Sequence, residues 1–101
     1  MIKVELQVPA DTQSDSVVKV VEQVCHANGL TQVSKGTLAS YPRCIHWHFK
    51  MDKQKGTLEI TWWESKNRLW FKVADGRVSD WINESMRKLK KQIEISLKER
   101  P

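Results

Sequence analysis

Three consecutive segments that alternate apolar and polar side chains constrain the fold of this chain more than any other feature. They cover residues 43–50, 57–63 and 68–74, and short connections at 51–56 and 64–67 join them. Alternation with a period of two is typical of strands that bury one face, and connections of this length are typical of hairpins. The sequence therefore predicts an antiparallel meander of three strands.

The alternation assigns the side chains of the meander to two faces. The apolar face, expected to pack beneath helices, comprises Ile45, Trp47, Phe49, Leu58, Ile60, Trp62, Leu69, Phe71 and Val73. The opposite face comprises Cys44, His46, His48, Glu59, Thr61, Trp63, Arg68, Trp70 and Lys72. We expect Trp47 and Trp62 to be core residues, provided that each indole N–H finds an acceptor.

Two amphipathic helices are predicted around this meander. The first covers residues 15–28, with Thr12 and Asp15 as a capping box at its start and Gly29 as a left-handed stop. The second begins at Ser79 or Asp80. Its apolar stripe comprises Ile82, Met86, Leu89, Ile93 and Leu97.

The rest of the chain adds strands at the edges. Residues 1–8 alternate in the same way and predict an N-terminal strand, while residues 30–42 predict a loop with a possible edge strand. The element order is then β-α-(β)-β-β-β-α. We predict a single α+β domain over residues 1–101, with two layers and both helices on one face of the sheet.

Composition limits the setting in which this domain works. The net charge is +5, and no apolar run approaches the roughly 20 residues that a membrane span requires. The thiols of Cys25 and Cys44 do not form a CxxC pair, and the N-terminus does not resemble a signal peptide. We therefore expect a cytoplasmic protein with free thiols and no membrane partner.

The second face of the meander is the candidate binding surface. Aromatic rings that stack on bases and cations that neutralise phosphates are the two ingredients of surfaces that bind single-stranded nucleic acid. A basic region on the last helix would support such contacts. The candidate residues are His46, His48, Trp63, Arg68, Trp70 and Lys72 on the sheet, with Arg87, Lys90 and Lys91 on the helix.

Two other uses of that face remain open. The N-terminal segment or residues 30–42 could cover Trp63 and Trp70, or a second copy of the chain could bury them in a homodimer. The positive charge also suits an acidic protein partner. These alternatives need the same side chains and differ only in what contacts them.

No catalytic or metal-binding residue is assigned at this face, although side chains suited to both roles are present. His46 and His48 have the spacing of two zinc ligands, with Cys44 or Glu59 as a third, but such histidine pairs are common on strands, so no metal or other cofactor is assigned. Cys44 beside His46 lacks an orienting carboxylate, so no catalytic residue is assigned either.

The sequence thus predicts a small non-enzymatic binding module whose open sheet face binds nucleic acid. The first alternative is a protein-interaction module that homodimerises through the same face. The second is a small metal- or thiol-dependent enzyme that uses Cys44, His46 and His48.

Overall fold

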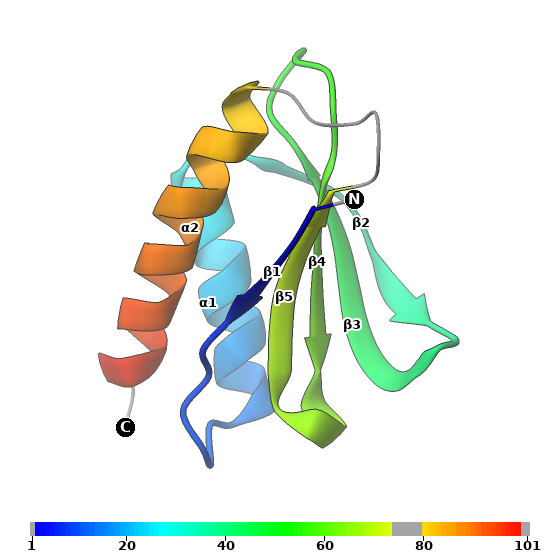
Figure 1. The fold of residues 1–101 in the computed structure, drawn as a ribbon, viewed down its shortest axis with the longest axis vertical. Coiled ribbons are helices and arrows are strands. Elements are labelled where there is room, and N and C mark those ends of the chain that lie inside the picture. The colour runs from blue at the N-terminus through cyan, green and yellow to red at the C-terminus, as the bar shows by residue number, and fades with distance from the viewer. Residues whose placement is uncertain (1, 74–79, 100–101) are drawn as a thin grey trace.

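A computed structural model describes residues 2–73 and 80–99, which form an antiparallel five-stranded sheet and two helices (Figure 1). In chain order the elements are β1 (Ile2–Leu6), α1 (Ser14–Ala27), β2 (Thr31–Leu38), β3 (Tyr41–Lys50), β4 (Leu58–Trp63), the 3-10 turn η1 (Glu64–Lys66), β5 (Arg68–Val73) and α2 (Asp80–Glu99). The strands lie in the order β1-β5-β4-β3-β2. This arrangement confirms the predicted α+β fold, in which the meander β3-β4-β5 is the centre of the sheet.

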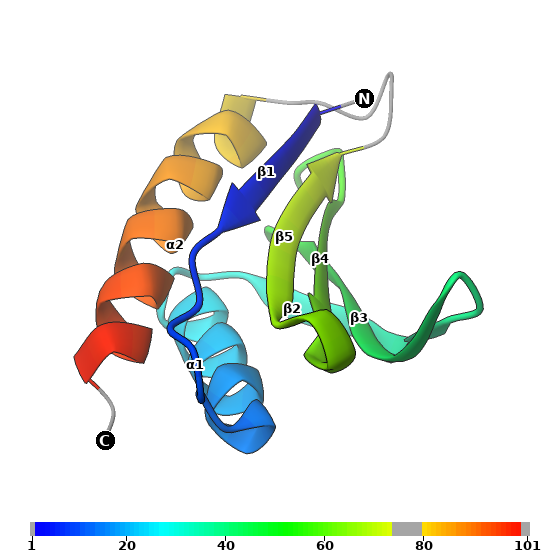
Figure 2. The same cartoon turned by 60° about the horizontal axis from the view of Figure 1, so that its bottom comes forward.

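Both helices pack on one face of the sheet, which we call the inner face (Figures 1 and 2). The apolar face predicted for the meander is this inner face: Ile45 is half-buried, and the other eight side chains are buried. The apolar stripe of α2 and the valines of α1 complete the same core. The period-two pattern therefore identified the core side of all three strands correctly.

The two large indoles of the core find the acceptors that their burial requires. Trp47 is fully buried and donates its Nε1–H to Glu22 Oε2 at 2.9 Å. Trp62 donates to Ser14 Oγ at 2.8 Å. Both acceptors lie on α1, so these hydrogen bonds also fix the position of that helix on the sheet.

The two ends of α1 contrast in how well the sequence predicted them. Gly29 has a φ of 83°, and the amides of Gly29 and Leu30 donate to the carbonyls of His26 and Cys25, each at 3.0 Å. This Schellman motif confirms the left-handed stop. The predicted capping box is wrong, because the N-cap is Gln13 without a side-chain hydrogen bond, and the Thr12 hydroxyl donates to the Pro9 carbonyl instead.

The strands at the two edges of the sheet settle the positions that the sequence left open. β1 pairs with β5, and the possible edge strand in residues 30–42 is the full strand β2, paired with β3. Residue 74 of the predicted last strand and the alternative helix start at Ser79 lie outside the described residues. Neither described helix is long and apolar enough to cross a membrane.

Candidate functional site

The outer face is the side of the sheet opposite the helices. None of the described helices packs on it (Figure 2). It carries the polar face of the meander together with the polar side chains of β1. Two groups of side chains occupy it. We call them the aromatic cluster (Lys3, Tyr41, Trp63, Arg68 and Trp70) and the histidine cluster (His46, His48, Glu59 and Thr61).

Trp70 forms the base of the aromatic cluster. The ring of Tyr41 meets it edge-on at 5.1 Å, and Lys3 Nζ and the Arg68 guanidinium lie 4.7 Å and 5.1 Å from its ring. Only 2% of Trp70 is exposed. The sequence placed Trp70 on the correct face and predicted a direct contact, but in this structure its ring lies beneath its neighbours. Tyr41, which belongs to the segment 30–42, covers the ring of Trp70.

Tyr41 reaches this position because the chain turns sharply at the start of β3. Arg43 adopts a left-handed conformation with a φ of 67°, and the pairing of β2 with β3 shifts register between Gly36 and Leu38. The turn buries Cys44, whose Sγ accepts a hydrogen bond from the Leu38 amide at 3.2 Å. A buried structural thiol of this kind does not fit the predicted alternative of a nucleophile at Cys44.

Cys25, the other thiol, is also enclosed. It is fully buried in the core, and burial, reinforced by the charge of Glu22, raises its pKa to about 12. A thiol with such a pKa is protonated at neutral pH and is a poor nucleophile.

Trp63 is a half-buried member of the aromatic cluster. Its ring meets Tyr41 edge-on at 4.9 Å. Its Nε1–H is the one buried side-chain nitrogen or oxygen within residues 2–73 and 80–99 that has no hydrogen-bond partner. A buried donor without a partner costs about 1–3 kcal/mol and calls for an explanation.

The histidine cluster joins β3 to β4. His46 and His48 lie two residues apart on β3, and the register places them opposite Thr61 and Glu59 on β4. The Nε2 atoms of the two histidines are 3.1 Å apart, and Glu59 Oε1 lies 3.1 Å from that of His46 and 3.8 Å from that of His48. The other ring nitrogen of His46, Nδ1, lies 2.8 Å from Thr61 Oγ1.

The environment of His46 favours its neutral form. Burial lowers the pKa of His46, and the charges of His48 and Lys72 act in the same direction, against the opposing effect of Glu59. The net shift is downward. A neutral imidazole held by a hydroxyl at one nitrogen can accept a hydrogen bond or bind a metal ion through its other nitrogen.

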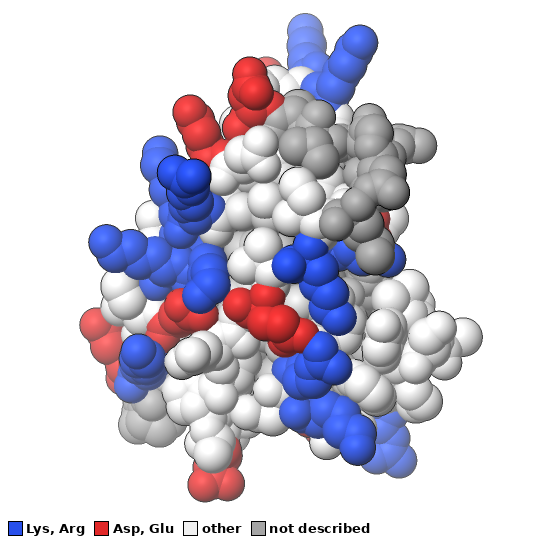
Figure 3. All heavy atoms as spheres, in the orientation of Figure 1, with Lys and Arg blue, Asp and Glu red and all other residues white. Residues whose placement is uncertain are grey.

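The basic side chains of the predicted site do not form one surface. Arg68 and Lys72 lie on the outer face, where Arg68 hydrogen-bonds to Glu5. Arg87, Lys90 and Lys91 lie on α2, which packs on the inner face, and basic and acidic side chains are intermixed along this helix (Figure 3). Lys90 pairs with Glu94 at 2.8 Å. The predicted basic support from α2 is therefore on the other side of the molecule.

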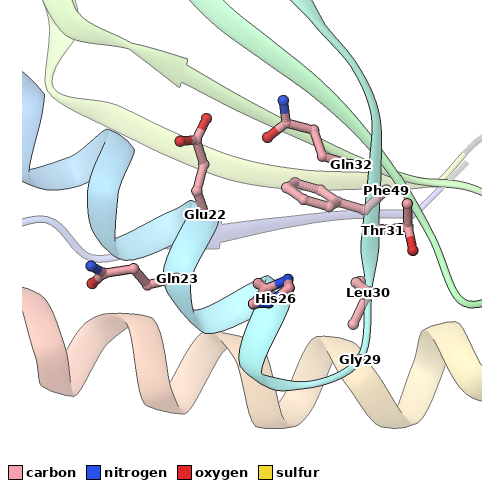
Figure 4. A pocket seen from close by; sticks show the side chains of 8 residues that line it. All are labelled: Glu22, Gln23, His26, Gly29, Leu30, Thr31, Gln32 and Phe49. Atoms are coloured by element: carbon pink, nitrogen blue, oxygen red, sulfur yellow. The ribbon is translucent and has the colours of Figure 1, made fainter.

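A hollow of about 590 Å³ lies between the C-terminal end of α1 and the start of β2 (Figure 4). It was not predicted from the sequence. Its charged wall is Glu22, whose carboxylate is already bonded to Trp47 and to Lys35 at 2.8 Å. His26 and Phe49 also line it. Because the Glu22 carboxylate is already bonded to Trp47 and Lys35, it is less available to a ligand than the polar groups of the outer face.

Two members of the aromatic cluster, Lys3 and Tyr41, were missed by the sequence reasoning. The signal for Lys3 was available, because residues 1–8 alternate and their polar side had to face the same way as the polar side of a neighbouring strand.

Comparisons of the chain with models of protein families, with curated proteins and with solved structures found no match.

Proposed function

We propose that this protein is a non-enzymatic binding module whose outer face binds a short single strand of nucleic acid at the aromatic cluster. The observation that carries the proposal is the unpaired indole N–H of Trp63 within a cluster flanked by cations. Aromatic rings on which bases stack and cations that contact the backbone are the groups that single-strand binding surfaces use. An indole N–H without a partner can in addition donate a hydrogen bond to the ligand.

The aromatic residues of the cluster differ in burial, and this difference sets the role of each in binding. Tyr41 and Trp63 are half-buried, so part of each residue is open to solvent, while the buried Trp70 packs against Tyr41. A base that stacks on an aromatic ring contributes about 1–3 kcal/mol, so contacts with these two rings suffice for weak binding. The indole N–H of Trp63 is buried in the unbound structure, so a ligand reaches it only when the neighbouring side chains move.

The charges around the cluster set the strength and salt dependence of binding. Lys3, Arg68 and Lys72 lie on adjacent strands β1 and β5, within reach of a backbone that crosses the cluster. Each phosphate neutralised on a single strand contributes about 0.7 to the slope of log affinity against log salt. If all three cations make contacts, the slope is about −2.

The test is a titration of labelled single-stranded oligonucleotides followed by fluorescence anisotropy at low and moderate salt. Replacing both Arg68 and Lys72 with glutamine should weaken binding and reduce the salt slope by about 1.4, because two phosphate contacts are lost. The matched control replaces Arg87 and Lys91 with glutamine, which removes the same charge from α2.

The comparison of the two double variants decides the proposal. We expect the α2 variant to bind nearly as well as the unmodified protein. Equal losses of oligonucleotide affinity in both variants would mean that binding depends only on the net charge of the protein and not on the outer face. Absence of binding at low salt in the unmodified protein would contradict the proposal outright.

A further inference from the structure

We propose that His46, His48 and Glu59 form a binding site for a divalent transition-metal ion, with zinc as the natural occupant. The site lies on the outer face but uses none of the side chains of the aromatic cluster. It therefore goes beyond the proposed nucleic-acid function and does not depend on it.

The spacing of the three ligand atoms carries this proposal. The Nε2 atoms of His46 and His48 and the Oε1 atom of Glu59 form a triangle with sides of 3.1, 3.1 and 3.8 Å. In a tetrahedral zinc site with bonds of about 2.0–2.1 Å, neighbouring ligand atoms are roughly 3.3 Å apart. A metal ion can therefore lie about 2 Å from all three atoms with only small adjustments of the side chains.

The nature of the three atoms supports the same conclusion. Two unprotonated imidazole nitrogens and a carboxylate oxygen each offer a lone pair, and here the three atoms lie within 3.8 Å of one another. A single proton can join only two of them, whereas a cation at the centre satisfies all three. Two histidines and one carboxylate are also a ligand set that zinc uses when its fourth position is left to water or substrate.

The surroundings of His46 hold it in the orientation that the site needs. Its Nδ1 faces the hydroxyl of Thr61 at 2.8 Å, and Thr61 is only 1% exposed. Ligating histidines are usually fixed by a hydrogen bond of this kind through the second ring nitrogen. Because that nitrogen is engaged, Nε2 is the atom left for a metal ion.

The opening of the site fits a three-ligand centre. His46 is 8% exposed, while His48 and Glu59 are half-buried, so the cluster is held from the sheet side and reached from solvent. The opposing feature is Lys72, which lies beside Glu59 in the register of β4 and β5. Its ammonium lowers the affinity of the site for any cation, so we expect moderate rather than very tight binding.

The experiment measures zinc binding to protein made without a histidine tag, by competition with a chromophoric chelator. Cobalt is used as a spectroscopic probe of the ligands. We expect one zinc ion per chain, no competition from excess magnesium, which prefers oxygen ligands, and a cobalt spectrum without thiolate bands. Replacing His48 with alanine, or Glu59 with glutamine, should weaken zinc binding by about tenfold or more.

The chain supplies its own matched control for these variants. His26 lies exposed on α1, far from the cluster in the fold, so His26→Ala removes the same side chain and should leave zinc binding unchanged. Thr61→Val keeps the shape of the residue but removes the partner of His46. It should weaken zinc about tenfold without changing the number of ions bound.

Three results would overturn the proposal. They are the absence of saturable zinc binding, binding that survives both His48→Ala and Glu59→Gln, and a cobalt spectrum dominated by thiolate. If the alanine variant does not fold, the cobalt spectrum of the unmodified protein still decides between imidazole and thiolate ligands. Oligonucleotide binding by the same variants separates this site from the aromatic cluster, because losing zinc should leave it intact.

Discussion

On the inner face of the sheet, Trp47 and Trp62 donate their indole N–H groups to acceptors on α1, whereas on the outer face the N–H of Trp63 has no partner. The same contrast holds for titratable groups. Glu22 on the inner side is bonded to Trp47 and Lys35, while the histidine cluster brings two imidazole nitrogens and a carboxylate oxygen within 3.8 Å of one another. The indole donors of the inner face have acceptors on α1. The described indole donor without a partner and the histidine cluster both lie on the outer face.

The largest expected difference between the two faces is in stability. Trp47→Ala removes a fully buried indole from the core and should lower the free energy of unfolding by about 3–5 kcal/mol. Trp63→Ala removes a half-buried indole and should cost less than half as much, roughly 1–2 kcal/mol. Chemical denaturation of both variants measures the difference, and equal costs would contradict this expectation.

Phenylalanine at the same two positions gives a narrower test. It keeps a six-membered aromatic ring and removes the pyrrole ring that carries the indole N–H. Trp47→Phe leaves Glu22 without its indole donor and should cost about 1–3 kcal/mol. Trp63→Phe removes a donor that has no partner, so we expect a change of less than about 1 kcal/mol in either direction. A larger cost at Trp63 would show that its N–H is satisfied in solution.

The smallest expected effect is on the pH dependence of stability and comes from Glu22 on the inner side of the sheet. Burial raises the pKa of Glu22, but the hydrogen bonds from Lys35 and Trp47 outweigh it, so the net shift is downward. A carboxyl group with a lowered pKa in the folded state stabilises that state above its unfolded pKa. This contribution disappears as the pH falls through the folded pKa.

The variant Glu22→Gln isolates this contribution, because its amide oxygen still accepts from Trp47 but carries no charge for Lys35. We expect the unmodified protein to be more stable than the variant at neutral pH. The difference should shrink as the pH falls below the ordinary glutamate value of 4.5. Denaturation curves at several pH values measure it, and a constant difference across that range would contradict the assignment.

The fold was largely predictable because its central strands follow a strict alternation. Ile60 and Phe71, for example, had to share a face with Trp47 once the period was recognised. β2 gave no such signal, because an edge strand whose side chains are nearly all exposed has no buried face to mark. The capping box failed for a different reason: Thr12 found a local acceptor at Pro9 that its sequence spacing did not reveal.

The site was predictable only in part, because its geometry depends on contacts between distant segments. The alternation identified the sheet face of Trp63, Trp70 and the two histidines correctly. It contained no information on the turn at Arg43 that brings Tyr41 over Trp70. It also gave no sign that Arg87 would lie on the far side, since this depends on which face of the sheet α2 covers.

Backbone amide chemical shifts, mapped while a short single-stranded oligonucleotide is added at low salt, show whether the outer face is the binding surface. We expect shifts concentrated in β3, β4 and β5, around Tyr41, Trp63 and Arg68. Shifts concentrated on α2 around Arg87 and Lys91, or no shifts at saturating oligonucleotide, would contradict it.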